Sequence, residues 1–315
     1  QGAADMGAQP HQGAGYMDVT DPKMNQLYNS FYGKEVPSHI GYKIPEMFDA
    51  AINGKLKAMW IIGEDVVQTD PNTNKVIKAL ESLDLLIVQE LFMTPTAELA
   101  TVILPGASFL EKDGTFTNGE RRVQRVNKVV EPIAGSKVDG QIIVDIMNRM
   151  GYQQDDYTGA GVLEEVSNIV PFFKGATWNG LSNNGKQWPI LEDGSDTQML
   201  HITEFKNGKG KFSFFNYEKS REVERHEKDF PYIITTNVLL INPNDAKKEG
   251  IRDGEFVCVE SPRGKVDIRA LVTDEMKEGI LSSTFHFPEI MLNIITSDEH
   301  DSEAMCPEYK VVSCR

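Results

Sequence analysis

The sequence predicts a protein of the α/β plus β class, with a parallel-sheet domain, an inserted β-hairpin and a C-terminal β-barrel. Short apolar segments alternate with helical segments between residues 58 and 105. This alternation is typical of a parallel sheet with helices on both faces. The dipeptide Asn118-Gly119 separates two strand-like segments, which is a strong hairpin signal. From residue 211 onward, short strands and turns dominate the pattern.

Composition limits the classes of function that fit this chain. Its 315 residues are 40% hydrophobic and 25% charged, which is typical of a globular protein with two or three domains. The net charge of −15 argues against generic nucleic-acid binding and against an anionic membrane surface, since both need a basic face. No apolar run reaches the roughly 18 residues of a membrane-spanning helix, so the sequence predicts no direct membrane insertion.

Cysteine content excludes several kinds of site. The chain has three cysteines, Cys258, Cys306 and Cys314, and no CxxC motif. A disulfide scaffold and a four-cysteine zinc or iron–sulfur site within this chain are therefore excluded. Few unpaired thiols fit a reducing compartment, so we predict a cytoplasmic location, and any export signal would precede Gln1.

The first 108 residues are expected to form a Rossmann-like αβα domain that is incomplete at its N-terminus. Asp70 and Pro71 suit the N-cap and the first position of a helix. Apolar runs and helical spacing give the elements in order: a helix at 44–52, a strand at 58–62, a helix at 72–83, a strand at 85–88, a helix at 94–100 and a strand at 102–105.

A hairpin is predicted to leave this domain over residues 109–135, with strands at 115–117 and 122–126. Residues 136–158 return to the αβα domain through a helix near 137–150, and residues 159–205 form a mixed linker region. The hairpin also carries a basic cluster. It could meet an anionic cofactor or an acidic partner, or it could be an ordinary solvated face; its members are Arg121, Arg122, Arg125 and Lys128.

Residues 206–315 are expected to form the barrel-like β domain. Proline near its start and glycine after its end predict a short helix at 242–250. Strands are predicted at 232–236, 254–259, 266–272 and 280–287, and the second and third of these are joined by a turn at 261–264.

Polar residues follow two predicted strands of the parallel sheet. Gly63, Glu64 and Asp65 follow the first strand, and Gln89 follows the second. Ligands of open α/β sheets bind at these carboxyl ends, and a carboxylate there can accept two hydrogen bonds from a guanine edge or from a ribose edge. The alternative is that Asp65, Thr69 and Asp70 only cap the next helix. No GxGxxG or P-loop motif is present, so a standard dinucleotide or P-loop site is excluded. His286, in an apolar run, fits either a core histidine or a ligand.

Several motifs in order resemble one family. They are WIIGED at 60–65 with QTD at 68–70, DLLIVQELFMT at 84–94, ATVILP at 100–105, EKDGTFTNGERRVQ at 111–124, FHFPE at 285–289 with Asn293, and PEYK at 307–310. This sequence resembles the catalytic subunit of molybdenum- or tungsten-dependent formate dehydrogenase, in the molybdopterin oxidoreductase (DMSO reductase) superfamily. The resemblance covers nearly the whole chain.

The resemblance implies a molybdenum or tungsten ion held by two molybdopterin guanine dinucleotides, a 4Fe-4S cluster, and interconversion of formate and carbon dioxide. It implies a double-psi barrel that binds the dinucleotide, and a hairpin that packs toward the cluster-bearing domain. It also implies site residues in two groups. The guanine pocket is formed by Gly63, Glu64, Asp65, Thr69, Gln89 and Asp139, and the pterin is lined by Phe285, His286, Asn293, Tyr309 and Lys310.

The chain departs from the family pattern in two ways. In the family, the residues that bind the metal and the cluster would precede Gln1. The same holds for the catalytic cysteine or selenocysteine, histidine and arginine, so no catalytic or metal-binding residue is expected here. A long cofactor-binding loop that usually follows the equivalent of Thr236 is also absent. Iron–sulfur electron-transfer subunits are the expected partners, in a hetero-oligomer. A non-catalytic structural relative, or another enzyme of the superfamily such as nitrate reductase, remains the alternative.

Overall fold

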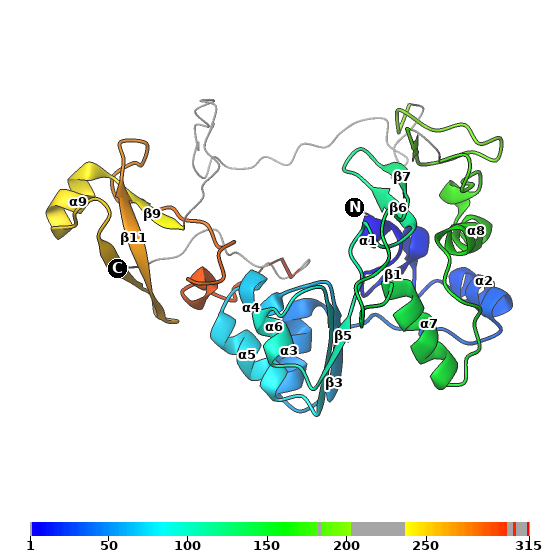
Figure 1. The fold of residues 1–315 in the computed structure, drawn as a ribbon, viewed down its shortest axis with the longest axis horizontal. Helices are drawn as coiled ribbons and strands as arrows, with labels where there is room; N and C mark the ends of the chain where they lie inside the picture. The colour runs from blue at the N-terminus through cyan, green and yellow to red at the C-terminus, as the bar shows by residue number, and fades with distance from the viewer. Residues whose placement is uncertain (1, 182–183, 203–236, 301–304, 307–313, 315) are drawn as a thin grey trace.

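The computed structural model describes residues 2–181, 184–202, 237–300, 305–306 and 314. Figure 1 shows three groups of elements: a central parallel sheet with helices, a group around the hairpin that includes the N-terminus, and a C-terminal β group. Within these residues the fold is mixed α/β, with four separate sheets. Among them, no helix is long and apolar enough to cross a membrane.

The central sheet has three parallel strands in chain order, β3 (Ala58–Ile62), β4 (Leu85–Glu90) and β5 (Val102–Pro105). Its register places Ile61 beside Val88, and Val88 beside Ile103. The three predicted strands are confirmed, and β4 continues two residues further than predicted. That extension brings Gln89 into the sheet, where its backbone pairs with both neighbours.

Helices cover one face of this sheet: α3 (Ile44–Ile52), α4 (Val66–Thr69), α5 (Thr73–Glu81) and α6 (Pro95–Glu98). Val88, Ala79 and Ala51 are completely buried in the core between them. Side chains alternate across a strand, and on the opposite face Ile62 and Val102 are more than 40% exposed. The prediction of helices on both faces is therefore wrong for the described part of the chain.

The prediction that Asp70 caps the helix after β3 is also wrong. Two helices follow the strand instead of one, and Asp70 ends α4 in an extended conformation. Proline disfavours the helical region for the residue before it, so Pro71 keeps Asp70 out of a helix. Asn72 is the N-cap of α5, with φ of 54° and a side chain that accepts from the amide of Lys75. Asparagine tolerates this left-handed conformation better than most residues.

The hairpin is confirmed, with β6 (Gly114–Thr117) antiparallel to β7 (Arg122–Val126). A third strand that the sequence did not indicate, β8 (Lys186–Gln187), pairs with β7. The core beside it contains Phe173, Leu163 and Val123. The other elements of this group are α1 (Gly2–Asp5), β1 (Gln12–Gly13), β2 (Met17–Asp18), α2 (Pro22–Tyr32), α7 (Asp139–Arg149) and α8 (Gly159–Ile169), with 3-10 turns at Ala14–Tyr16 and Pro171–Phe173.

The C-terminal group is a three-stranded sheet with the order β10 (Phe256–Glu260), β11 (Lys265–Val272), β9 (Val238–Ile241). Strand β9 is parallel to β11 and is followed by α9 (Pro243–Glu249). The helix, β10 and β11 confirm their predictions. The strand predicted at 232–236 lies outside the described residues.

The strand predicted at 280–287 is not formed. Only one isolated bridge is present there, between Leu240 and Ser282, and Phe285 and His286 are exposed. Among the described residues the segment has no continuous neighbouring strand, which a ladder requires, and it leads into a 3-10 turn at Leu292–Ile294. No closed barrel is found in the part of the chain that the structure describes.

Candidate functional site

The turn after β3 places two predicted site residues next to the end of β4. Gly63 has φ of 64°, which favours glycine, and its amide donates to the carbonyl of Gln89 at 2.9 Å. Asp65 Oδ1 accepts from the amide of Thr96 at 3.1 Å and from its hydroxyl at 2.5 Å. Thr96 is fully buried and was missed from the sequence, because a threonine in the first turn of a helix carries no distinctive signal.

Glu64 and Thr69 meet on the open side of the same turn. The Thr69 hydroxyl donates to Glu64 Oε1 at 2.7 Å. Together with Asp70 they line a cavity of about 680 Å³, whose other walls come from residues 8–10, 41–45, 47 and 305. Burial, with a smaller contribution from the charge of Glu64, raises the pKa of Asp70 to about 6.

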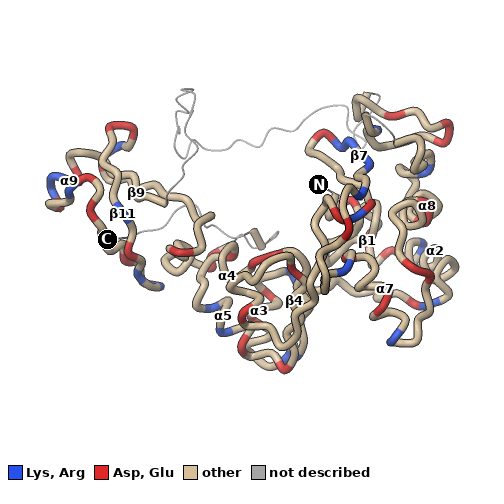
Figure 2. The backbone as a smooth tube through the Cα atoms, viewed as in Figure 1, with Lys and Arg blue, Asp and Glu red and all other residues tan. Residues whose placement is uncertain are grey.

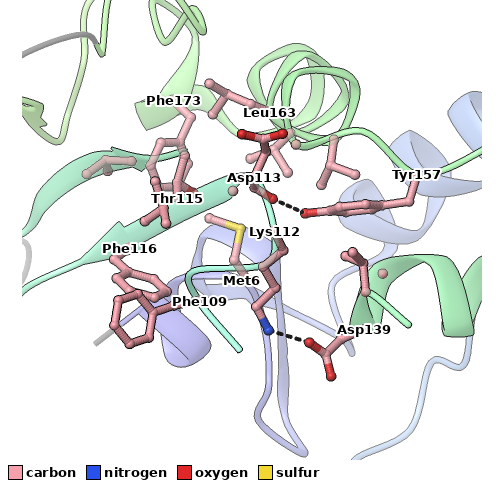
Figure 3. A pocket seen from close by; sticks show the side chains of 18 residues that line it. Met6, Phe109, Lys112, Asp113, Thr115, Phe116, Asp139, Tyr157, Leu163 and Phe173 are labelled. Carbon is pink, nitrogen blue, oxygen red and sulfur yellow. Dashed lines mark hydrogen bonds and ion pairs between the residues drawn. The ribbon is translucent and has the colours of Figure 1, made fainter. Parts of the chain in front are cut away.

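Gln89 and Asp139 lie together on the other side of β4. Gln89 is 1% exposed, and its Nε2 donates to Asp139 Oδ1 at 2.9 Å. The other carboxylate oxygen of Asp139 forms an ion pair with Lys112, which is the lower dashed line in Figure 3. This pair borders a separate, mainly apolar cavity of about 240 Å³ beside the hairpin. Lys112 was not among the predicted residues.

This network fixes the orientation of the Gln89 amide. A carboxylate only accepts hydrogen bonds, so the NH₂ group of Gln89 must face Asp139. Gln89 Oε1 then lies buried with no hydrogen-bond donor among the described residues. A buried unpaired acceptor costs about 1–3 kcal/mol, so this oxygen is suited to receive a donor from a ligand.

The predicted residues from the C-terminal group occupy different positions. Asn293 is 2% exposed and its side chain contacts the backbone of α4. The carbonyl oxygen of Phe285 accepts from Gln68 Nε2 at 3.4 Å, while its ring is 44% exposed. His286 is exposed, with its ring 4.1 Å from that of Phe287, so the core-histidine interpretation is wrong. Tyr309 and Lys310 lie outside the described residues.

The basic cluster of the hairpin, blue near β7 in Figure 2, is occupied by contacts within the chain. Arg121 donates to the carbonyl of Trp188, and Arg122 pairs with Glu120 at 2.8 Å. Arg125 lies over the ring of Trp178, and Lys128 pairs with Glu131 at 2.9 Å. These contacts favour the structural interpretation of the cluster over an anion-binding one.

Two acceptor oxygens near these strand ends can pair with donor groups of a ligand. Gln89 Oε1 and Asp65 Oδ2 receive no hydrogen bond from the residues described here. Guanine presents an N–H and an NH₂ group side by side, and oxygen acceptors match them. The same described residues contain no cluster of three or more histidine, cysteine or acidic side chains that could hold a metal ion.

Two family models match most of the chain. Residues 1–149 match the model described as molybdopterin oxidoreductase, and residues 217–313 match the model described as molydopterin dinucleotide binding domain. The first covers the parallel sheet and the hairpin, and the second covers the C-terminal β group. The two predicted groups of site residues therefore fall within the two matched regions.

Curated relatives are similar over the full length of this chain. It is 35% identical to F420-dependent formate dehydrogenase subunit alpha of Methanocaldococcus jannaschii, over all of this chain and 50% of that protein. It is 34% identical to formate dehydrogenase H of Escherichia coli, over all of this chain and 48% of that protein. The chain thus spans about half the length of these relatives. Both alignments are longer than the chain itself, so this sequence lacks residues that the relatives have.

A solved structure supports the fold. Acetylene hydratase from Pelobacter acetylenicus aligns with a TM-score of 0.62 at 19% identity, covering 93% of this chain and 49% of that one. At this identity the likeness concerns the fold alone.

Proposed function

Because this chain belongs to the molybdopterin oxidoreductase family, we propose that it is the cofactor-binding part of a formate dehydrogenase catalytic subunit. The whole protein would interconvert formate and carbon dioxide at a molybdenum or tungsten bis-molybdopterin guanine dinucleotide. Its electrons would leave through a 4Fe-4S cluster to iron–sulfur partner subunits. The observation that carries the proposal is the buried Gln89 Oε1, which has no hydrogen-bond partner among the described residues and lies at a strand end that the family model covers.

The proposed guanine pocket lies between the turn after β3 and the end of β4. Asp65, anchored through Oδ1 by Thr96, would accept from the base with its second oxygen. Gln89, oriented by Asp139, would accept with its carbonyl oxygen. Glu64 and Thr69, which line the larger cavity, would contact the ribose, and Gly63 would allow close approach of the backbone.

Residues of the C-terminal group would line the pterin. We propose this role for the exposed side chains of Phe285 and His286, and for Tyr309 and Lys310. The cofactor supplies the redox chemistry when bound. The residues of this chain bind and orient it and keep its nucleotide away from water. The proposal also includes the finer features predicted from the sequence. These are a double-psi barrel, a Rossmann-like domain, domain boundaries after residues 108, 135, 158 and 205, and the cytoplasmic location.

Cofactor analysis of the full-length subunit tests the proposal. We expect molybdenum or tungsten by mass spectrometry, guanine nucleotide after acid hydrolysis in twofold molar ratio to the metal, and formate-dependent reduction of a viologen dye. A protein with neither metal nor guanine would instead be a non-catalytic relative. Nitrate-dependent oxidation of the reduced dye without formate activity would indicate a nitrate reductase.

A pair of variants tests the role of Gln89 Oε1 as an acceptor for the base. Gln89→Glu replaces the NH₂ group by an oxygen facing Asp139, so two carboxylates would meet and the base would lose its oriented acceptor. We expect guanine content to fall about tenfold. Gln141→Glu in α7, whose amide group contacts Asp145 and Asp156 away from the pocket, should leave guanine content unchanged. Equal content in both variants would contradict the role of Gln89.

A further inference from the structure

Residues 293–298, which follow the C-terminal sheet, lie directly against α4 and α5 of the central sheet. Asn293 Nδ2 donates to the carbonyl oxygens of Gln68 at 2.8 Å and of Thr69 at 3.1 Å. These carbonyls lie at the end of α4, where a helix has no partners of its own for them. Asn293 thus satisfies two helix-end acceptors from 225 positions away in sequence.

A second set of contacts joins the same segment to the start of α5. The Asn72 amide donates to Thr296 Oγ1 at 3.2 Å, and Asn72 Nδ2 donates to Asp298 Oδ1 at 3.1 Å. Lys75 Nζ lies between Asp298 at 2.8 Å and Asp49 of α3 at 2.9 Å. Its side chain is only 21% exposed, so this pair is less screened than a surface salt bridge.

The Asn293 contacts hold a helix that cannot be rigid by itself, and the second set of contacts holds α5, which follows it directly. Helix α4 has four residues, and such a short helix is not stable without tertiary contacts. Its C-terminal residue, Thr69, also lines the cavity of about 680 Å³ and bonds Glu64. The position of α4 therefore sets the shape of the proposed nucleotide pocket, and Asn293 helps to set the position of α4.

We propose that Asn293, Thr296 and Asp298, with Asn72 and Lys75, form an interdomain latch that positions α4 so that the dinucleotide is retained. Asn293 is a positioning residue in this account, because its amide group is committed to the backbone of Gln68 and Thr69. The effect on the cofactor rests on the proposed function, whereas the effect on α4 does not.

Matched lysine variants in the full-length subunit test the latch. Lys75→Met removes the ion pair with Asp298 and also the one with Asp49. Lys78→Met is its control, because Lys78 is exposed on the same helix and has no ion pair among the described residues. In Lys75→Met we expect about tenfold faster loss of guanine nucleotide during dialysis, and faster hydrogen exchange over residues 66–72. In Lys78→Met neither rate should change.

Asn293→Asp supplies the second variant. Its carboxylate faces the carbonyls of Gln68 and Thr69 without a donor, so exchange over residues 66–72 should rise at least as much as in Lys75→Met. Asn293→Ser keeps a donor and should restore part of the protection. Unchanged exchange in both Lys75→Met and Asn293→Asp would overturn the latch. Wild-type protein without guanine would contradict the proposed function, and the exchange data would still decide the latch.

Discussion

The central sheet and the C-terminal sheet both have three strands, but they are stabilised in different ways. The central sheet has a continuous core of eleven buried residues. Among the residues that the structure describes, the C-terminal sheet has two smaller clusters, of five and three buried residues. The central sheet is thus stabilised mainly by apolar burial. In its described part, the C-terminal group adds polar contacts to α5, which Thr296 and Asp298 make after the last strand of the sheet.

We expect the truncation of a buried leucine to lower the free energy of unfolding more in the large core than in the small cluster. Leu86 is 1% exposed within the large core, and Leu239 is 5% exposed within the smaller cluster. We expect Leu86→Ala to destabilise the central sheet by about 3–5 kcal/mol. Leu239→Ala should cost about 2 kcal/mol, because a small cluster can collapse around the cavity. Hydrogen exchange resolved by strand measures both values, and a larger effect at Leu239 would reverse the comparison.

Substitution of Asn72 tests the contacts between α5 of the central sheet and the segment that follows the C-terminal sheet. Asn72→Ala removes the cap of α5 and the side-chain contact to Asp298, keeps the backbone amide that donates to Thr296, and leaves alanine in a left-handed conformation. The cap and the conformation each contribute about 1 kcal/mol, so we expect a loss of about 2 kcal/mol in thermal or urea unfolding.

Asn72→Gly is the control for conformation. Glycine adopts the same positive φ without strain, so it should lose only the side-chain contacts and be more stable than Asn72→Ala. Equal stability of the two variants would show that the left-handed backbone carries no strain.

Asp70 gives the central sheet a pH dependence. Its folded pKa of about 6 lies above the ordinary value of 3.8. The folded chain therefore binds more protons than the unfolded chain between about pH 4 and pH 6, and stability falls as pH rises through this range. Asp70→Asn should remove that slope and add about 1 kcal/mol at pH 7, after allowance for partial exposure. Urea unfolding from pH 4 to pH 7 measures it, and an unchanged slope would contradict the assignment.

The smallest expected effect on stability concerns Gly250, the C-cap of α9 in the C-terminal group. It has φ of 71° and nothing within 4 Å of an added Cβ, so Gly250→Ala should cost about 1 kcal/mol through conformation alone. Gly119 also has open space and no positive φ, so Gly119→Ala should change stability little. Thermal unfolding of the two variants separates conformational cost from packing.

The sequence was most informative where apolar runs and turn dipeptides act locally. The strands at 58–62 and 102–105, the hairpin at Asn118-Gly119 and the helix after Asn242 follow from such signals. It failed where tertiary contact decides. The segment 280–287 has strand-like composition, but the part of the chain that the structure describes places no continuous strand beside it. Asn72 becomes a cap because Pro71 and the contacts to Thr296 and Asp298 fix its conformation.

The site shows the same division. Glu64, Asp65, Thr69 and Gln89 could be found because they follow predicted strands. Thr96 and Lys112 could not, since each acts through a contact with a residue far away in sequence. Asn293 was expected to line the pterin, and only the structure reveals its two bonds to α4.

The latch also has a consequence for the order in which the protein folds. Its hydrogen bonds join residues 224 to 226 positions apart, whereas β3 and β4 pair after a short crossover. Contacts of long sequence separation form late, because the chain must close a long loop before it gains them. We therefore expect the central sheet to form first and the latch last. A bulky dinucleotide would then enter most easily after the central sheet has formed and before the hydrogen bonds of the latch form.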